Sequence, residues 1–446
     1  MTEDTQSGIQ PRDSTERMAK QYQREISRLR LSPSFRIGTH IVKAFERPWK
    51  LLFIWISLPV LLWKVAMERL GRREPVYDGL HLPPASETGN CIILFPTNGV
   101  GFGHFTRMLA VARRLRKVDR DLEIVFFTTM PTLHILTEEG FPAYHVSGKS
   151  HFSDMEPKAW NSVCEELLLN VFAIHRPKAF VFDGAFPYRG MLNAIKNQDG
   201  MLKIWMKRGT LKSNASSIPV GSVQHFDTII TPSDGSSTKL EAVEGVEMVV
   251  CDPIVLASKE ELLPRHVLRS RLGIPDEATL VYVQLGAGRI NDIESEIRMT
   301  IDTLMEYQDV YVVIGESMIG ERIEFNHSRV RILRDYPNSL YFNSFDFAII
   351  AGGYNSIHEA VRFQLPSICY PNMNTGKDDQ LMRARLIEEA GGLIVVKQRT
   401  KRAIKQAIVK MLDSEFRIQL VNDSSEINLE DGSMEVADWL VNQISK

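Results

Sequence analysis

Short apolar runs alternate with amphipathic stretches from residue 90 onward. The first run, CIILFP, is followed by a stretch in which Met108, Val111 and Leu115 share one face, which is the spacing of a helix that packs on a core. We expect strands at 91–96, 122–127, 142–146, 178–182, 202–206, 227–230 and 247–250. We expect helices near 132–139 and 157–174. This alternation predicts an α/β fold with a parallel sheet covered by helices.

The pattern restarts after a proline-containing connector at 251–275. Further strands are expected at 280–285, 309–314, 329–333, 346–350 and 367–370, and helices at 293–307, 355–363, 379–390, 401–412 and 434–444. Both halves contain a strand that runs into a glycine turn and a helix, at 91–104 and at 280–293. We therefore predict two Rossmann-like domains, 90–250 and 276–446, with ligand space at the carboxyl ends of their strands.

The amino-terminal part differs from the rest. Residues 1–15 are polar and are expected to be disordered, whereas 16–75 form a basic and apolar segment with helical character. Its apolar run Leu51–Trp63 (LLFIWISLPVLLW) is shorter than the roughly 20 residues that a spanning helix needs. Three alternatives remain: an anchor on an anionic membrane surface, a helical hairpin packed on the core, and a true span. We favour the anchor, and expect peripheral or monotopic attachment at the cytoplasmic face of the membrane.

Composition narrows the class of protein. The net charge of −2 over 446 residues argues against a nucleic-acid partner. The four cysteines form no CxxC motif, which favours reduced thiols in the cytosol. No HExxH motif or Cys/His cluster indicates a metal site, so none is expected, and Asp119-Arg120-Asp121 fits a solvated loop.

The stretch from Gly352 to Gln380 contains groups suited to a nucleotide-sugar. The glycine pair Gly352-Gly353 lets backbone N–H groups approach a diphosphate, and Asn355 and Ser356 begin a helix whose amino terminus attracts anions. Glu359, one turn into that helix, can accept hydrogen bonds from ribose hydroxyls. Asp379 and Gln380 begin the next helix and can hold sugar hydroxyls.

The first glycine turn offers a catalytic base. His104 follows Gly101 and Gly103 at a helix start, and imidazole titrates near neutral pH. Asp183 ends the apolar strand AFVFD and can orient His104 or bind an acceptor. Arg107 lies one turn after His104 and can meet an acidic group of the acceptor or donor.

These motifs together resemble the two-Rossmann (GT-B) glycosyltransferases, and most closely the MurG-like branch, over about residues 90–415. The matching elements are the GxGH loop, the Gly286-Ala287-Gly288 turn, the G-x-x-S-x-x-E element and the later Asp-Gln pair. The first loop departs from that branch because Arg107 stands where a proline is usual. The form GxGHxxR also resembles a nucleotide-sugar hydrolase of the same fold.

The resemblance implies an inverting, metal-independent glycosyltransferase that moves N-acetylglucosamine or a related hexose from a UDP-sugar to a membrane-bound or glycan acceptor. UDP-sugar is then a co-substrate, and no other cofactor is expected. His104 and Asp183 would be catalytic, with Gly101, Gly103 and Arg107 on the acceptor side. The residues expected to bind the donor are Gly286, Gly288, Gly353, Asn355, Ser356, Glu359, Asp379 and Gln380. Alternatives are a nucleotide-sugar hydrolase and a non-catalytic scaffold that binds nucleotide-sugar.

Overall fold

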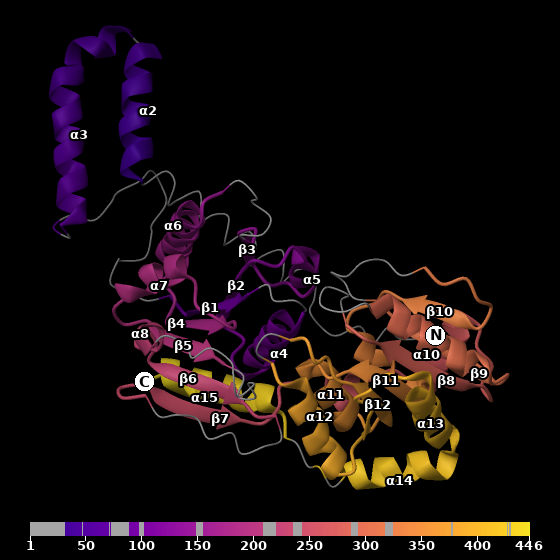
Figure 1. Cartoon of the computed structure of the whole chain (residues 1–446). Helices are drawn as coiled ribbons and strands as arrows, with labels where there is room; N and C mark the ends of the chain where they lie inside the picture. The colour runs from indigo at the N-terminus through magenta and orange to yellow at the C-terminus, as the bar shows by residue number, and fades with distance from the viewer. Residues whose placement is uncertain are drawn as a thin grey trace.

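The computed structural model describes residues 32–46, 48–70, 72, 89–97, 102–148, 155–207, 220–234, 243–286, 293–316, 324–375, 378–425, 427 and 430–446. These residues form two α/β domains side by side and a separate helical hairpin near the amino terminus (Figure 1). Gly101 and Gly288, both expected to line the site, lie outside the described residues.

The amino-terminal domain is built on a parallel sheet of seven strands in the order β3-β2-β1-β4-β5-β6-β7. Its strands are β1 (Cys91–Pro96), β2 (Glu123–Thr128), β3 (Ala143–His145), β4 (Ala179–Asp183), β5 (Leu202–Met206), β6 (Thr228–Pro232) and β7 (Glu247–Cys251). The strand order reverses between β1 and β4, which pair in register from Ile92–Ala179 to Pro96–Asp183. Ligands of such sheets bind at the carboxyl ends of the strands beside this reversal.

Helices cover both faces of this sheet. On one face α4 (Gly103–Val118) and α5 (Leu133–Glu138) pack on residues such as Leu94 and Phe126. On the other face α6 (Pro157–His175) and α7 (Arg189–Lys196) pack on Phe95 and Phe182. The short α8 (Val220–Val223) precedes β6.

The carboxy-terminal domain has a parallel sheet of six strands in the order β10-β9-β8-β11-β12-β13. Its strands are β8 (Thr279–Gln284), β9 (Val310–Gly315), β10 (Val330–Leu333), β11 (Phe347–Ala351), β12 (Ser367–Tyr370) and β13 (Ile394–Val395). One face is covered by α10 (Ile293–Met305), α13 (Lys401–Leu412) and α14 (Ser414–Ser425). The other is covered by α9 (Arg265–Leu272), η4 (Asn338–Ser344), α11 (Tyr354–Arg362) and α12 (Gln380–Glu389).

The two sheets confirm the predicted fold class, but the domain boundaries differ from the sequence-based ones. The last helix, α15 (Gly432–Ile444), returns to the amino-terminal domain, where Val436, Ala437 and Leu440 join the core against α4. The connector 251–275 contains η3 (Lys259–Glu261) and the helix α9. Hydrophobic spacing predicts helix 434–444 but cannot tell which domain its apolar face packs on.

The amino-terminal hairpin consists of α2 (Pro33–Glu46), η1 (Pro48–Phe53) and α3 (Ile54–Arg69). It projects away from both domains in Figure 1. An ion pair between Arg36 and Glu68 and a 2.8 Å hydrogen bond between His40 Nε2 and Ser57 Oγ hold the two helices together. The alternative of a hairpin packed on the core is therefore wrong, because its apolar side chains are exposed: Phe35, Val42, Phe45, Trp49, Leu52, Phe53, Trp55, Ile56, Val60, Leu62 and Trp63.

Candidate active site at the domain interface

His104 and Asp183 meet beside the reversal of strand order in the amino-terminal sheet. His104 lies in the first turn of α4, and Asp183 is the last residue of β4. The Nδ1 atom of His104 is 2.6 Å from Oδ1 of Asp183, whose side chain is fully buried, while 11% of the His104 side chain is exposed. The structure thus brings together the two residues that the sequence predicts to be catalytic.

Arg107 completes this cluster. Its Nη2 atom donates to Oδ1 of Asp183 at 2.7 Å and its Nε atom donates to Oδ2 at 3.1 Å. Burial acts to raise the pKa of Asp183, but the charges of Arg107 and His104 and their hydrogen bonds outweigh it, so the pKa is lowered. Asp183 is therefore an ionised carboxylate at neutral pH.

The cluster defines the state of the imidazole. A carboxylate can only accept, so the 2.6 Å contact requires that Nδ1 of His104 carries a hydrogen and donates it to Asp183. The neutral ring then has its lone pair on Nε2, the atom that can take a proton. Arg107 Nη2, although 3.0 Å from Nδ1, is a second donor and cannot bond to it in this state.

Arg107 does not lie where the sequence suggests. Only 1% of the residue is exposed, and its guanidinium is occupied by Asp183 and by the ring of Tyr354, 5.2 Å away. We assign it to positioning Asp183, because a fully buried guanidinium has no surface to offer an acceptor. The space around Gly103 does not require a glycine, since an added Cβ would meet only Arg107 Nη1 at 4.0 Å.

A second buried network joins the two domains. Arg383 of α12 donates from Nε to Oδ1 of Asp234, which follows β6, at 2.8 Å, and from Nη2 to Oδ1 of Asp378 at 2.6 Å. Nε2 of His358 is 3.4 Å from Asp234 Oδ1. Burial opposes ionisation of Asp234, yet the bonds and charges of His358 and Arg383 lower its pKa. An ionised Asp234 in the amino-terminal domain thus binds a cation of the carboxy-terminal domain.

Tyr354 connects this network to the catalytic cluster. Its ring lies 5.2 Å from the Arg107 guanidinium and 5.7 Å from that of Arg383, within the range of cation–π attraction. Its hydroxyl accepts a 3.0 Å hydrogen bond from the backbone N–H of Ile254 in the connector. The first residue of α11 therefore touches the amino-terminal domain, the connector and α12, so the start of α11 is held beside His104 and Asp183.

The proposed donor side is assembled around the start of α11. An added Cβ on Gly352 would lie 2.9 Å from Cβ of Gln380 and 3.1 Å from Cα of Pro371, so this position must be glycine for Gln380 to approach β11. Oε1 of Gln380 accepts from the backbone N–H of Asn372 at 2.9 Å, so the amide NH2 group is the part of this side chain that can donate to a ligand. Oδ1 of Asn355 is buried and makes no hydrogen bond among the described residues.

Glu359 is a buried carboxyl group whose pKa is raised, in contrast to Asp183 and Asp234, whose pKa values are lowered. Burial among protein atoms raises its pKa to about 7, and the 3.0 Å hydrogen bond from Ser339 Oγ only partly opposes this. A carboxyl group that gives up its proton near neutral pH at a polar interface is a frequent mark of a functional site.

Other expected donor residues have local structural roles. Asp379 caps α12 by accepting from the backbone N–H of Met382 at 3.0 Å. Gly286 has a φ of 104°, which favours glycine, and Gly353 precedes α11 with ordinary backbone angles. His358, the neighbour of Glu359 in the sequence, is fully buried against Asp234 and Tyr354.

Sequence reasoning missed Asp234, Tyr354 and Arg383. One signal for Asp234 was present, because it is an acid two residues after the end of the apolar strand β6, near the carboxyl end of the sheet where Asp183 also lies. For Arg383 there was none, since an arginine four residues into a helix is usually solvated.

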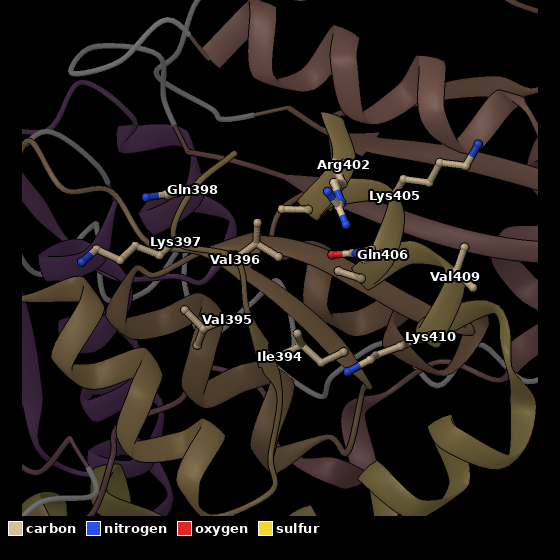
Figure 2. Close-up of a pocket in the computed structure, with 12 residues that line it drawn as sticks. Ile394, Val395, Val396, Lys397, Gln398, Arg402, Lys405, Gln406, Val409 and Lys410 are labelled. Carbon is tan, nitrogen blue, oxygen red and sulfur yellow. The ribbon is translucent and has the colours of Figure 1, made fainter. Parts of the chain in front are cut away.

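A separate cavity lies on the carboxy-terminal domain between β13 and α13, with a volume of about 740 Å³. Val396 and Ile394 contribute apolar walls, and Lys397, Arg402 and Lys410 contribute charge (Figure 2). None of the site residues described above lines it, so it is distinct from the domain interface.

Two parallel sheets whose carboxyl ends meet across this interface define a protein of the GT-B fold class. No protein-family model matches the chain. It is 27% identical over 219 residues to the UDP-N-acetylglucosamine--N-acetylmuramyl-(pentapeptide) pyrophosphoryl-undecaprenol N-acetylglucosamine transferase of Clostridioides difficile (strain 630), which covers 46% of this chain and 51% of that protein. The chain spans about half the length of the curated relatives that it matches.

Solved structures agree on the fold. MurG of Acinetobacter baumannii superposes with a TM-score of 0.53 at 12% identity, over 79% of this chain and 99% of that one. The spinosyn rhamnosyltransferase SpnG, solved with thymidine diphosphate, has a TM-score of 0.53 at 15% identity, over 80% of this chain and 100% of that one. The resemblance to MurG-like glycosyltransferases is thereby confirmed in sequence similarity and in fold.

Proposed function

We propose that the protein is an inverting, metal-independent glycosyltransferase that moves N-acetylglucosamine or a related hexose from a UDP-sugar to a hydroxyl of a lipid-linked or glycan acceptor. The observation that supports it most is the 2.6 Å contact between His104 Nδ1 and Asp183 at the end of β4. This pair lies next to the first turn of α11, which Tyr354 holds against the same cluster. A base and an anion-binding helix start are thus adjacent, one from each domain.

In this proposal His104 acts as general base. Nε2 takes the proton of the acceptor hydroxyl while the oxygen attacks the anomeric carbon and the bond to the diphosphate breaks. The ionised Asp183 stabilises the imidazolium that forms and keeps the ring oriented, and Arg107 fixes Asp183 in turn. Attack from the side opposite the leaving group inverts the anomeric centre.

The carboxy-terminal domain would hold the donor. Backbone N–H groups at the start of α11 and the side chains of Asn355 and Ser356 would receive the diphosphate, whose developing charge the helix terminus stabilises. Glu359 would accept from ribose hydroxyls, and the amide of Gln380 would donate to the sugar. Water as acceptor would give the alternative hydrolase, recognised by free sugar released without any added acceptor.

Donor affinity should depend on pH through Glu359. Because its pKa is about 7, the carboxylate that ribose hydroxyls require is scarce at pH 6 and predominant at pH 8. UDP-sugar should therefore bind about tenfold more tightly at pH 8 than at pH 6 in isothermal titration, since the ionised fraction changes by about that factor.

The matched control is Glu359→Gln. It should bind donor weakly and equally at both pH values, and it should also unfold at a higher temperature than the parent at pH 8. The second effect follows because folding raises the pKa of Glu359 from 4.5 to about 7. As the pH rises from 4.5 to 7, the unfolded chain loses this proton more readily than the folded protein, so the free energy of unfolding falls. Glutamine carries no such proton and avoids this loss. A parent affinity that is high and equal at both pH values would contradict the role of Glu359.

Membrane attachment is proposed for the amino-terminal hairpin. The stretch Trp49–Glu68 is a 20-residue helical segment with a mean hydropathy of 1.7, and only 6% of it is buried. It pairs with α2 in the opposite direction, so the hairpin begins and ends on the same side. Lys43, Lys50 and Lys64 lie among its exposed apolar side chains and suit lipid phosphates. We infer monotopic attachment, which would bring the catalytic domains to a lipid-linked acceptor.

Replacing Trp49, Trp55 and Trp63 together by serine should weaken binding to anionic phospholipid vesicles more than tenfold, as measured by co-sedimentation. These three side chains are 61%, 72% and 57% exposed, so the folded state loses little. A matched triple variant, Phe186→Ser, Val250→Ser and Ile418→Ser, removes exposed apolar groups from the two domains and should bind like the parent. Equal binding by both triple variants would exclude the hairpin as the anchor.

A further inference from the structure

Three side chains that could hold a metal ion converge at the end of the amino-terminal sheet opposite to His104 and Asp183. Cys91 is the first residue of β1, Glu123 is the first residue of β2, and His175 is the last residue of α6. One ligand atom from each lies within 4.8 Å of the other two. A thiol, a carboxylate and an imidazole are therefore gathered at one point from segments far apart in the sequence.

The imidazole of His175 is placed as that of a metal ligand. Its Nε2 atom is 2.9 Å from the hydroxyl of Tyr144, which leaves Nδ1 to face the other two groups. Nδ1 is buried and makes no hydrogen bond among the described residues, although Oε2 of Glu123 lies only 3.2 Å away. Two ligands bound tetrahedrally at about 2.0–2.1 Å from one ion would be separated by about 3.3 Å.

The backbone supports this convergence. The N–H of Gly89 donates to the carbonyl of Arg176 at 2.8 Å, which lays the entry to β1 against the end of α6. A Cβ at Gly89 would lie 2.4 Å from the His175 carbonyl oxygen, so only glycine allows this approach. The N–H of Glu123 donates to the carbonyl of Asn90 at 2.8 Å, which brings the start of β2 to the same point.

We propose that Cys91 Sγ, Glu123 and His175 Nδ1 bind one zinc ion. A thiolate with an imidazole and a carboxylate favours zinc over magnesium or calcium, and water completes the tetrahedron. The Cys91 thiol releases its proton to solvent as the Zn–S bond forms. Tyr144 holds the other ring nitrogen of His175, as outer groups of zinc sites commonly do. The ion lies at the far end of β1 from the catalytic cluster and ties β1, β2 and α6 together, so it takes no part in sugar transfer.

Metal analysis of the untagged full chain tests the site. Inductively coupled plasma mass spectrometry after incubation with zinc and dialysis should find about one zinc per chain. Glu123→Gln and Cys91→Ser should each lower the bound zinc at least tenfold. Cys164→Ser is the matched control, because Cys164 is a buried thiol of the same domain that is not part of the cluster, and it should retain the ion.

Cobalt gives a second measurement, whose first result is read from the parent protein itself. The parent loaded with Co²⁺ should show the charge-transfer absorption of a cobalt–thiolate bond, and Cys91→Ser should lack it while Cys164→Ser keeps it. A chelator should lower the unfolding temperature of the zinc-loaded parent and not that of Glu123→Gln, since a ligand lost from the folded state removes its stabilisation. Two results would overturn the proposal. One is a parent protein that retains less than about a tenth of an equivalent of zinc. The other is a Cys91→Ser variant that has the same zinc content and the same cobalt spectrum as the parent.

Discussion

Replacing His104 by alanine should reduce the rate of sugar transfer by a factor of about 10²–10⁴, the usual contribution of a positioned general base. The loss should fall on kcat, because His104 lies on α4 of the amino-terminal domain whereas the proposed donor contacts lie on α11 and α12. UDP release in the presence of acceptor measures the rate, and isothermal titration with UDP-sugar measures donor affinity, which should change less than threefold.

His134→Ala is the control for this change. His134 is an exposed histidine of the same domain, so its removal should leave both quantities unchanged. A His104→Ala enzyme with more than half of the parent rate would show that another group removes the proton, or that transfer does not limit turnover.

Replacing Asp183 by asparagine should both destabilise the protein and abolish most of its activity. The change leaves the guanidinium of Arg107, which is 1% exposed, without its carboxylate, and removing one partner of a buried ion pair costs about 3–5 kcal/mol. It also replaces a carboxylate that can only accept by an amide that can donate as well, so the tautomer of His104 is no longer fixed and the imidazolium loses its counter-charge. We therefore expect a rate loss of at least about 10²-fold. Denaturant unfolding and the UDP-release assay measure the two effects.

The double variant Asp183→Asn with Arg107→Met separates stability from chemistry. It removes the unpaired charge, so it should recover much of the lost unfolding free energy, because partners of one buried pair are not additive. It should not recover activity, since His104 still lacks the carboxylate that orients it. Full activity in the double variant would mean that Asp183 acts only through the stability of the fold.

Sequence predicted most of the fold because parallel strands buried on both sides are short apolar runs, and the helices between them have one apolar face. It also predicted His104, Asp183 and Glu359 as site residues, since these groups follow strands or glycine turns at the carboxyl edge of a sheet, and His104 and Asp183 are in contact in the structure. The same reasoning cannot show how far a side chain is buried. Arg107 therefore looked like a ligand for the acceptor, whereas its guanidinium is enclosed by Asp183 and Tyr354.

Contacts between distant segments are the part that sequence could not predict. Asp234 and Arg383 are 149 positions apart and meet only because the two domains dock. The packing of α15 could not be predicted either, because the pattern of its apolar face would suit the core of either domain. The meeting of Cys91, Glu123 and His175 was also hidden, because their spacing in the sequence matches no local metal motif. Such pairings are set by the path of the chain between elements, which hydrophobic periodicity does not record.

The central claim is that the domain interface transfers a sugar from a UDP-sugar to an acceptor in the membrane. It is tested most directly by incubating the full chain with radiolabelled UDP-sugars and bacterial lipid extract, and by following the label after phase separation. The account predicts that one UDP-sugar gives label in the organic phase in proportion to UDP released, and that His104→Ala gives almost none. It would be contradicted if no UDP-sugar were consumed, or if all the label appeared in water as free sugar whether or not lipid was present.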